Sequence, residues 1–128
     1  MAGRAAGSGD RMGFREHVAL QVQPGVDGEA EVVVDAGANH LNPNGTVHGG
    51  VLATMLDVAM AAAAATAGAE SPVTVALTVT YLEPGQPGRL IARAKVRKRG
   101  KRLLVVEAEV VQADDVLADA LGTFSVKA

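Results

Sequence analysis

The sequence of 128 residues contains no cysteine and only three aromatic residues, one tyrosine and two phenylalanines. Without cysteine the chain forms no disulfide and no zinc site with thiolate ligands, which fits the reducing cytoplasm. With so few aromatic rings it offers almost nothing on which nucleic-acid bases stack. Its formal net charge of −2 gives no general attraction to nucleic acid or membrane. We therefore expect a cytoplasmic protein that binds neither.

The chain also lacks a convincing membrane-spanning run. Its apolar run over 51–65 is alanine-rich and interrupted by Asp57, whereas a transmembrane helix needs about 20 apolar residues. Residues 1–13, MAGRAAGSGDRMG, are small, polar and Gly-rich, and they predict a disordered leader without a secretory signal. Apolar residues make up 48% of the chain. This is an ordinary share for a globular protein, and we expect one domain over 14–128.

Before the apolar run, the pattern predicts two strands and a loop. Residues 17–22 are expected to form a short strand that ends in the turn-like Pro24-Gly25 and Asp27-Gly28. Residues 29–35, EAEVVVD, alternate between apolar and acidic side chains and predict a half-buried strand. Residues 36–47 are rich in Gly, Asn and Pro, as is typical of a loop.

A single long helix is predicted next. It begins near Gly49 or Gly50 and ends near Thr66, with Gly68 as a plausible C-cap. Its residues are apolar nearly all round, which predicts a helix enclosed by other structure.

One polar stripe interrupts this helix. Gly50, Thr54, Asp57 and Ala61 are spaced so that they share one side, and this small, polar stripe is suited to lining a groove. A buried ionised carboxylate costs several kcal/mol unless other groups compensate. Asp57 must therefore face water, have hydrogen-bond partners or have a function.

Strand patterns fill the rest of the chain. Residues 73–82, VTVALTVTYL, alternate so that the apolar side chains at odd positions are expected to share one face. Residues 89–98 and 103–112 predict a hairpin, and residues 116–126 a last strand. One helix and five or six antiparallel strands predict an α+β domain, with a curved sheet wrapped around the helix.

The spacing of Asn42, Gly45, His48-Gly49-Gly50 and Asp57 resembles the hotdog-fold acyl-CoA thioesterases of the phenylacetate-pathway (PaaI-like) group. The resemblance continues through "VTVALTVTYLEP" and "KRGKRLLVVEAEV" to "ALGTFSV", so it covers nearly the whole chain after the leader. It implies a homodimer, often assembled into a homotetramer, with active sites between subunits. It implies an acyl-CoA substrate and neither a metal nor a cofactor.

The resemblance also implies roles for individual residues. The Gly49 N–H donates to the thioester carbonyl, and Asp57 of the other subunit is nucleophile or general base. Asn42 orients water or the carbonyl, His48 fixes the loop or assists in polarising the carbonyl, and Thr74 holds the acid. A helix N-terminus supplies free N–H groups, and glycine lets a carbonyl approach them closely.

Substrate contacts are predicted at three further places. Gly50 and Thr54 belong to the polar stripe. Eight of the twelve Lys and Arg lie within 89–102, and Arg97, Arg99 and Lys101 are candidates to bind the phosphates of coenzyme A. The acyl pocket is expected to be lined by aliphatic side chains and by Met55 or Met60, with Tyr81 or Phe124.

Each of these residues also has a purely structural interpretation. Asp57 could be hydrogen-bonded to Thr54 or a nearby loop, His48 could cap the loop, and Asn42 could be an ordinary turn residue. The basic segment could be a solvated face. His40, His48 and Asp57 do not form a known ligand set, so we expect no metal.

Two rival functions belong to other classes. One is a hotdog protein that binds an acyl thioester without hydrolysing it, although a pure binder has no need of the acid at Asp57. The other is a hotdog dehydratase of hydroxyacyl thioesters, which generally arranges its histidine differently.

Overall fold

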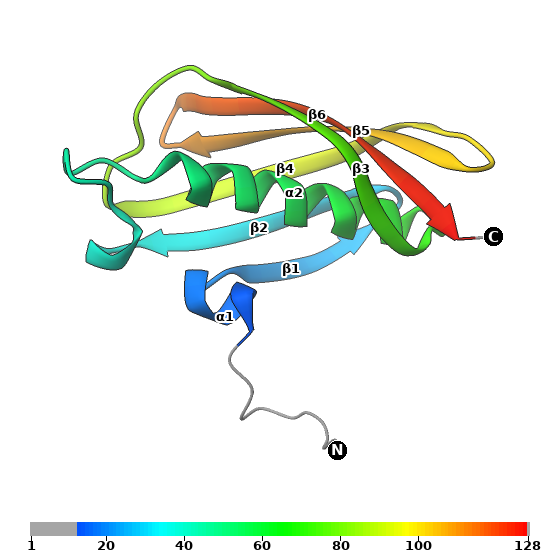
Figure 1. Ribbon diagram of the computed structural model, residues 1–128, viewed down its shortest axis with the longest axis horizontal. Helices are drawn as coiled ribbons and strands as arrows, with labels where there is room; N and C mark the ends of the chain where they lie inside the picture. Colours follow the sequence, from blue (N-terminus) through cyan, green and yellow to red (C-terminus); the bar gives the residue numbers. More distant parts are fainter. Residues whose placement is uncertain (1–12, 128) are drawn as a thin grey trace, which may run out of the picture.

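The computed structural model describes residues 13–127 and contains one antiparallel sheet curved around one long helix (Figure 1). The sheet has the order β1-β2-β4-β5-β6-β3. The elements are α1 (Phe14–Val18), β1 (Gln21–Val26), β2 (Glu29–Ala36), the 3₁₀ turn η1 (Ala38–His40), α2 (Gly49–Thr66), β3 (Glu70–Tyr81), β4 (Gly88–Arg99), β5 (Leu103–Gln112) and β6 (Asp115–Lys127). The predicted α+β architecture is confirmed. Residues 1–12 of the predicted leader lie outside the described residues.

The core lies between α2 and the sheet. One side of α2 is fully packed, and its buried residues are Leu52, Met55, Leu56, Ala59, Met60, Ala63 and Ala64. They meet buried side chains of the sheet such as Leu90, Leu104 and Phe124. The opposite side of α2, which carries Val51 and Val58, is only half-buried. The prediction of a helix enclosed on all sides is therefore wrong for a single chain.

Both ends of α2 are fixed by specific hydrogen bonds. At the start, the His48 side chain accepts the Gly50 N–H. At the end, Gly68 has a φ of +93°, and its N–H donates to the Ala65 carbonyl at 3.1 Å. The Ala69 N–H donates to the Ala64 carbonyl at 3.0 Å. These two bonds form a Schellman motif, with Gly68 as the residue that follows the C-cap Ala67.

By length and composition, α2 also passes for a membrane-spanning helix. The sequence argument that its apolar run is too short therefore understated its length. Because its apolar side packs on the sheet and its open side carries Asp57, we interpret α2 as the core helix of a folded domain.

The N-terminal segment differs from its prediction. The expected strand over 17–22 is wrong, because α1 ends at Val18 and β1 runs from Gln21 to Val26. The expected turn at Pro24-Gly25 lies inside β1, next to an irregularity in its pairing with β2. Proline is tolerated there because β1 is an edge strand. The turn at Asp27-Gly28 is present, with φ values of 53° and 80°.

A bulge in β3 decides which side chains face α2. Thr74 pairs with Phe124 and Ala76 pairs with Thr123, so Val75 is an extra residue in β3. The bulge shifts the alternation by one, because side chains in a strand point to opposite faces in turn. Thr74 therefore shares the helix-facing side with Leu77, whereas Val73 is 63% exposed. The prediction of unbroken alternation through 73–82 is wrong.

Candidate active site

The first turn of α2 presents one free N–H group. The Gly50 N–H donates to His48 Nδ1 at 2.8 Å, and the Val51 N–H donates to the His48 carbonyl at 2.9 Å. The Tyr81 hydroxyl donates to the Gly49 carbonyl at 2.9 Å. Within residues 13–127 the Gly49 N–H itself meets no acceptor. It is thus an available donor at the positive end of an 18-residue helix.

The Tyr81 ring closes one side of this turn. A Cβ atom added to Gly49 would lie 3.3 Å from the ring, so glycine is the residue that fits between the ring and an incoming carbonyl. Sequence reasoning considered Tyr81 only as a pocket residue and missed this contact. The signal was present, because the single tyrosine ends the most regular strand pattern, directly before Leu82-Glu83-Pro84-Gly85.

The loop before α2 is shaped by Asn42. Its side-chain oxygen accepts the N–H groups of Asn44 at 2.9 Å and Thr46 at 3.2 Å, and its amide donates to Thr46 Oγ1 at 2.8 Å. The amide of Asn42 is therefore engaged within its own loop. The structure places Asn42 as a turn residue in the wall of the same hollow as Gly49, and a contact with substrate stays a prediction.

The buried side chain of His40 also holds this loop in place. Its Nδ1 accepts the Gly37 N–H at 2.9 Å, so its Nε2 carries the proton that is donated to the Val18 carbonyl at 2.7 Å. The His40 carbonyl accepts the His48 N–H at 2.8 Å. The Nε2 bond thus joins α1 to the loop that begins α2, and the Nδ1 bond holds the turn after β2.

Asp57 is held by Thr74. The Thr74 hydroxyl donates to Asp57 Oδ1 at 2.6 Å, a short, charge-assisted hydrogen bond. Thr54, the alternative partner, instead donates to the Gly50 carbonyl at 2.7 Å. Asp57 is half-buried on the open side of α2, and its second oxygen has no donor among residues 13–127. Its position thus leaves one carboxylate oxygen available.

A single chain does not bring Asp57 to Gly49. Eight residues of helix separate them, or about 12 Å at 1.5 Å per residue. Asp57 is tied through Thr74 to one part of β3, whereas Gly49 is tied to Tyr81 at its end. The structure therefore brings together Asp57 with Thr74, and Gly49 with His48, as two separate groups.

Comparison with known proteins identifies the family of the domain that carries these two groups. Residues 44–118 match the family model of the Thioesterase superfamily. The chain belongs to this superfamily. The acyl-coenzyme A thioesterase PaaI of Escherichia coli is 37% identical over 86 residues, which cover 66% of this chain and 61% of that protein. A Halobacterium salinarum protein that carries the name of an esterase is 35% identical over 118 residues, covering 87% and 77% of the two chains.

Solved structures agree with this assignment. The conserved protein PA5202 from Pseudomonas aeruginosa has a TM-score of 0.85 and 33% identity, covering 91% of this chain and 95% of that one. A variant of the phenylacetic acid degradation protein PaaI from Thermus thermophilus has a TM-score of 0.83 and 33% identity, covering 89% and 98%. This chain is thus a PaaI-like hotdog thioesterase, a thioester hydrolase.

The basic hairpin of this thioesterase lies far from Gly49 of the same chain. Arg97 pairs with Glu107 at 3.1 Å. Arg99 reaches the Gly68 carbonyl at 3.5 Å, so it lies beside the C-terminal end of α2, and Lys101 is exposed in the hairpin loop. The three predicted phosphate ligands are therefore not equivalent, because Arg97 already has an acidic partner.

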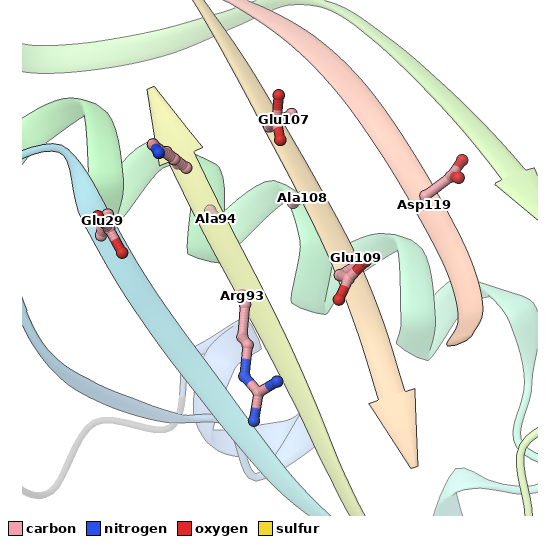
Figure 2. A pocket seen from close by; sticks show the side chains of 8 residues that line it. Glu29, Arg93, Ala94, Glu107, Ala108, Glu109 and Asp119 are labelled. Atoms are coloured by element: carbon pink, nitrogen blue, oxygen red, sulfur yellow. The ribbon is translucent and has the colours of Figure 1, made fainter. Parts of the chain in front are cut away.

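The outer face of the thioesterase sheet is a network of opposite charges (Figure 2). Arg89 pairs with Asp35 at 3.0 Å, and the hydrogen bond from Arg89 lowers the pKa of the Asp35 carboxyl. A hollow of about 420 Å³ on this face is lined by Glu29, Arg93, Ala94, Lys95, Glu107, Ala108, Glu109 and Asp119. It faces away from α2 (Figure 2) and contains no candidate catalytic residue.

Two hollows flank the first turn of α2 instead. One of about 320 Å³ lies beside Gly49 and includes Asn42, Tyr81 and Glu83. The other, of about 340 Å³, includes His48 and Gly50. The prediction that methionines or Phe124 line the acyl pocket is contradicted, because Met55, Met60 and Phe124 are fully buried in the core.

Proposed function

We propose that this thioesterase is a cytoplasmic acyl-CoA thioesterase that releases a carboxylic acid and free coenzyme A. The observation that carries the proposal is the hydrogen bond from Thr74 to Asp57, combined with the free N–H of Gly49. Coenzyme A as the thiol is supported by the name of the Escherichia coli relative. The absence of cysteine fits a reducing compartment.

The active site is assembled between two subunits. β3 is a 12-residue edge strand, and Val73 and Val75 on it are 63% and 59% exposed. An apolar edge of this length favours pairing with another strand. If two copies of β3 pair antiparallel, the Thr74 end of one strand lies beside the Tyr81 end of the other. Asp57 of one subunit then approaches Gly49 of its partner.

In the proposed dimer, one subunit supplies the Gly49 N–H and the other supplies Asp57. The Gly49 N–H donates to the thioester carbonyl oxygen and stabilises the negative charge that develops there, a contribution of about 3 kcal/mol for one such donor. Asp57, fixed by Thr74, uses its free oxygen either to attack the carbonyl carbon or to take a proton from a water that attacks it. On the first route the C–S bond breaks to leave a mixed anhydride on Asp57, which water then hydrolyses to the carboxylic acid, and the leaving thiolate takes a proton from water. On the second route the water adds to the carbonyl carbon, the C–S bond breaks, and the leaving sulfur takes up the proton that Asp57 removed from the water.

Coenzyme A has phosphates that the hairpin is suited to bind. Lys98, Arg99, Lys101 and Arg102 are exposed at its tip and have no acidic partner within 4 Å among residues 13–127. In the proposed dimer, the hairpin of the subunit that supplies Asp57 faces the same site. We assign the phosphates to Arg99 and Lys101 rather than to Arg97. The reaction needs no cofactor and no metal.

A homotetramer is the larger assembly that this surface supports. The half-buried side of α2 contains apolar side chains that a second dimer would cover, among them Val58, Ala61 and Ala62. Membership of the Thioesterase superfamily favours hydrolysis over the two rival functions, binding without turnover and dehydration of a hydroxyacyl thioester.

The test is thiol release from a panel of acyl-CoA thioesters, measured with a thiol reagent. We expect turnover by the parent and a fall of at least about 100-fold in kcat for Asp57→Asn, which preserves shape but removes the charge. Asp35→Asn is the matched control, because Asp35 lies on the outer face beside Arg89. Parent-like turnover by Asp57→Asn would refute the assignment, and an enoyl product would indicate a dehydratase.

A further inference from the structure

A second cavity borders the first turn of α2 on the side of α1. It measures about 340 Å³ and is walled by Phe14 and Val18 of α1, Leu41 of the loop and Val51 of α2. His48 and Gly50, the neighbours of Gly49 in the chain, also belong to its wall, whereas Gly49 itself lines the hollow beside Tyr81. A thioester whose carbonyl oxygen accepts the Gly49 N–H has two arms, the acyl group and the coenzyme A group. One arm must extend either into this cavity or into the hollow beside Tyr81.

The lining of this cavity is uncharged. It contains no Asp, Glu, Lys or Arg, whereas the hollow beside Tyr81 includes Glu83. Part of its polar groups is occupied, because His40 uses both ring nitrogens, His48 accepts the Gly50 N–H through Nδ1, and Thr54 donates to the Gly50 carbonyl. Such a lining favours an apolar group and offers nothing to a phosphate. The acyl arm fits this cavity better than the coenzyme A arm.

The volume of the cavity indicates how large an acyl group it can hold. Taking ~30 Å³ for each methylene-sized group, about the volume of a water in liquid, 340 Å³ has room for about ten such groups. Phe14 is 66% exposed, so its ring is available to cover an occupant. His40 holds α1 in place through the Val18 carbonyl.

We propose that α1, Leu41 and Val51 form the acyl-recognition pocket of the thioesterase, with Phe14 as its cover. The pocket takes an uncharged aliphatic or aryl acyl group of up to about ten carbons. This inference rests on the proposed function, because it assigns the direction of the two arms of an acyl-CoA held at Gly49.

The experiment measures kinetics on acetyl-, butyryl-, octanoyl- and phenylacetyl-CoA. Phe14→Ala removes the cover, and it should raise KM for octanoyl- and phenylacetyl-CoA about five- to ten-fold while leaving acetyl-CoA unchanged. Val51→Phe narrows the pocket and should lower kcat/KM for the same two substrates but not for acetyl-CoA. The control is Val26→Ala, since Val26 is also 66% exposed but lies at the far end of β1.

Product inhibition separates the two arms. Free coenzyme A lacks the acyl group, so its inhibition constant should be the same in the parent and in Phe14→Ala. A weaker inhibition in the variant would show that the cavity holds the coenzyme A arm, and an equal loss for every acyl length would also overturn the proposal. A change in molecular mass on Phe14→Ala without ligand would show that a second copy of the chain covers the cavity.

A thioether probe keeps the pocket testable if the parent hydrolyses no acyl-CoA. S-octyl-CoA and S-ethyl-CoA cannot be hydrolysed, and their affinities can be measured by calorimetry. Phe14→Ala should weaken S-octyl-CoA about five- to ten-fold and leave S-ethyl-CoA unchanged. Equal affinities of the parent and the variant for both probes would refute the acyl pocket. If the parent shows no turnover but the affinities change as expected, only the proposed function is refuted.

Discussion

Polar side chains around the start of α2 are used mainly to hold the backbone. His48 caps the helix through Gly50, Asn42 closes its own turn, and His40 joins the loop to α1. The consequence is that the Gly49 N–H stays free in a rigid frame. Preorganised donors of this kind stabilise an oxyanion more than mobile ones, because no reorganisation is needed during the reaction.

Tyr81 is the residue whose part in this frame is easiest to test. Tyr81→Phe keeps the ring against Gly49 but removes the hydroxyl that donates to the Gly49 carbonyl. We expect a loss of stability of about 0.5–1.5 kcal/mol, typical of one hydrogen bond. Because the first turn loosens, kcat should fall several-fold while KM changes little. Denaturant unfolding and steady-state kinetics measure the two effects separately.

The control for Tyr81→Phe is Ser125→Ala, which also removes an exposed hydroxyl that donates to a backbone carbonyl. Ser125 contacts the Val73 carbonyl at 3.4 Å, away from Gly49. Both variants should lose some stability, but only Tyr81→Phe should lose kcat. An unchanged kcat in Tyr81→Phe would mean that the ring only packs and that the hydroxyl positions nothing.

At the scale of elements, long periodic segments were predicted well and irregular ones were not. α2 ends at Thr66 and β5 spans 103–112, as their patterns indicate, because many residues report the same period. The predicted strand over 17–22 and the turn at Pro24-Gly25 are wrong, because β1 begins only at Gln21 and includes that pair. The Pro24-Gly25 pair is a turn signal by composition, but the edge position of β1 accommodates it within a strand.

The bulge in β3 could not be predicted from one strand alone. The odd positions of 73–81 are all apolar and the even positions are Thr or Ala, so the pattern shows no break at Val75. The extra residue shows only in the pairing with β6. Strict alternation would place Thr74 on the face opposite Leu77 and thus away from Asp57. The resemblance to the family indicated Thr74 for this role, and the bulge supplies the physical reason why it can reach the carboxylate.

Thr74 variants test whether this face assignment matters for catalysis. Thr74→Val keeps the shape but removes the donor to Asp57 Oδ1, so the carboxylate loses its fixed position. We expect kcat to fall about 10-fold or more, equivalent to about 1.4 kcal/mol of lost positioning. Thr74→Ser retains the hydroxyl and should keep most of the activity in the same thiol-release assay.

Thr78→Val is the matched control on the same strand. Thr78 pairs with Leu121 on the outer face and makes no side-chain contact with Asp57. Its substitution should leave kcat unchanged. Equal losses in the Thr74 and Thr78 variants would indicate a general effect on β3 and would remove the special role of Thr74.

At the scale of the whole molecule, one chain holds the two halves of the proposed active site apart. It holds an acid with one free oxygen and a helix tip with one free N–H, about 12 Å apart along the helix axis. The apolar edge of β3 lies between them. The motif spacing in the sequence indicated Asp57 and Gly49 individually. In the proposed dimer these groups meet through contacts between two copies, which no periodicity within one chain records.

Subunit mixing tests this arrangement directly. Asp57→Ala removes the acid. Gly49→Pro removes the N–H at the first helical position, where proline is compatible with the backbone and its ring displaces the exposed Tyr81 side chain. Each variant alone should be inactive. When equal amounts are co-expressed, half of the dimers are mixed, and in each of these one of the two sites has both Gly49 and Asp57. Activity should therefore return to about one quarter of the parent value in this two-fold assembly.

The reciprocal mixture decides between the two geometries. In this mixture a chain that carries both substitutions is co-expressed with an equal amount of parent. If the site is shared between subunits, neither site of a mixed dimer has both Gly49 and Asp57, so both are inactive. Only parent homodimers then work, and activity should again be about one quarter. If each chain instead contained a complete site, this mixture would retain about one half and the mixture of single variants would stay inactive. One pair of thiol-release measurements on protein purified at equal subunit ratios thus distinguishes a shared active site from a self-contained one.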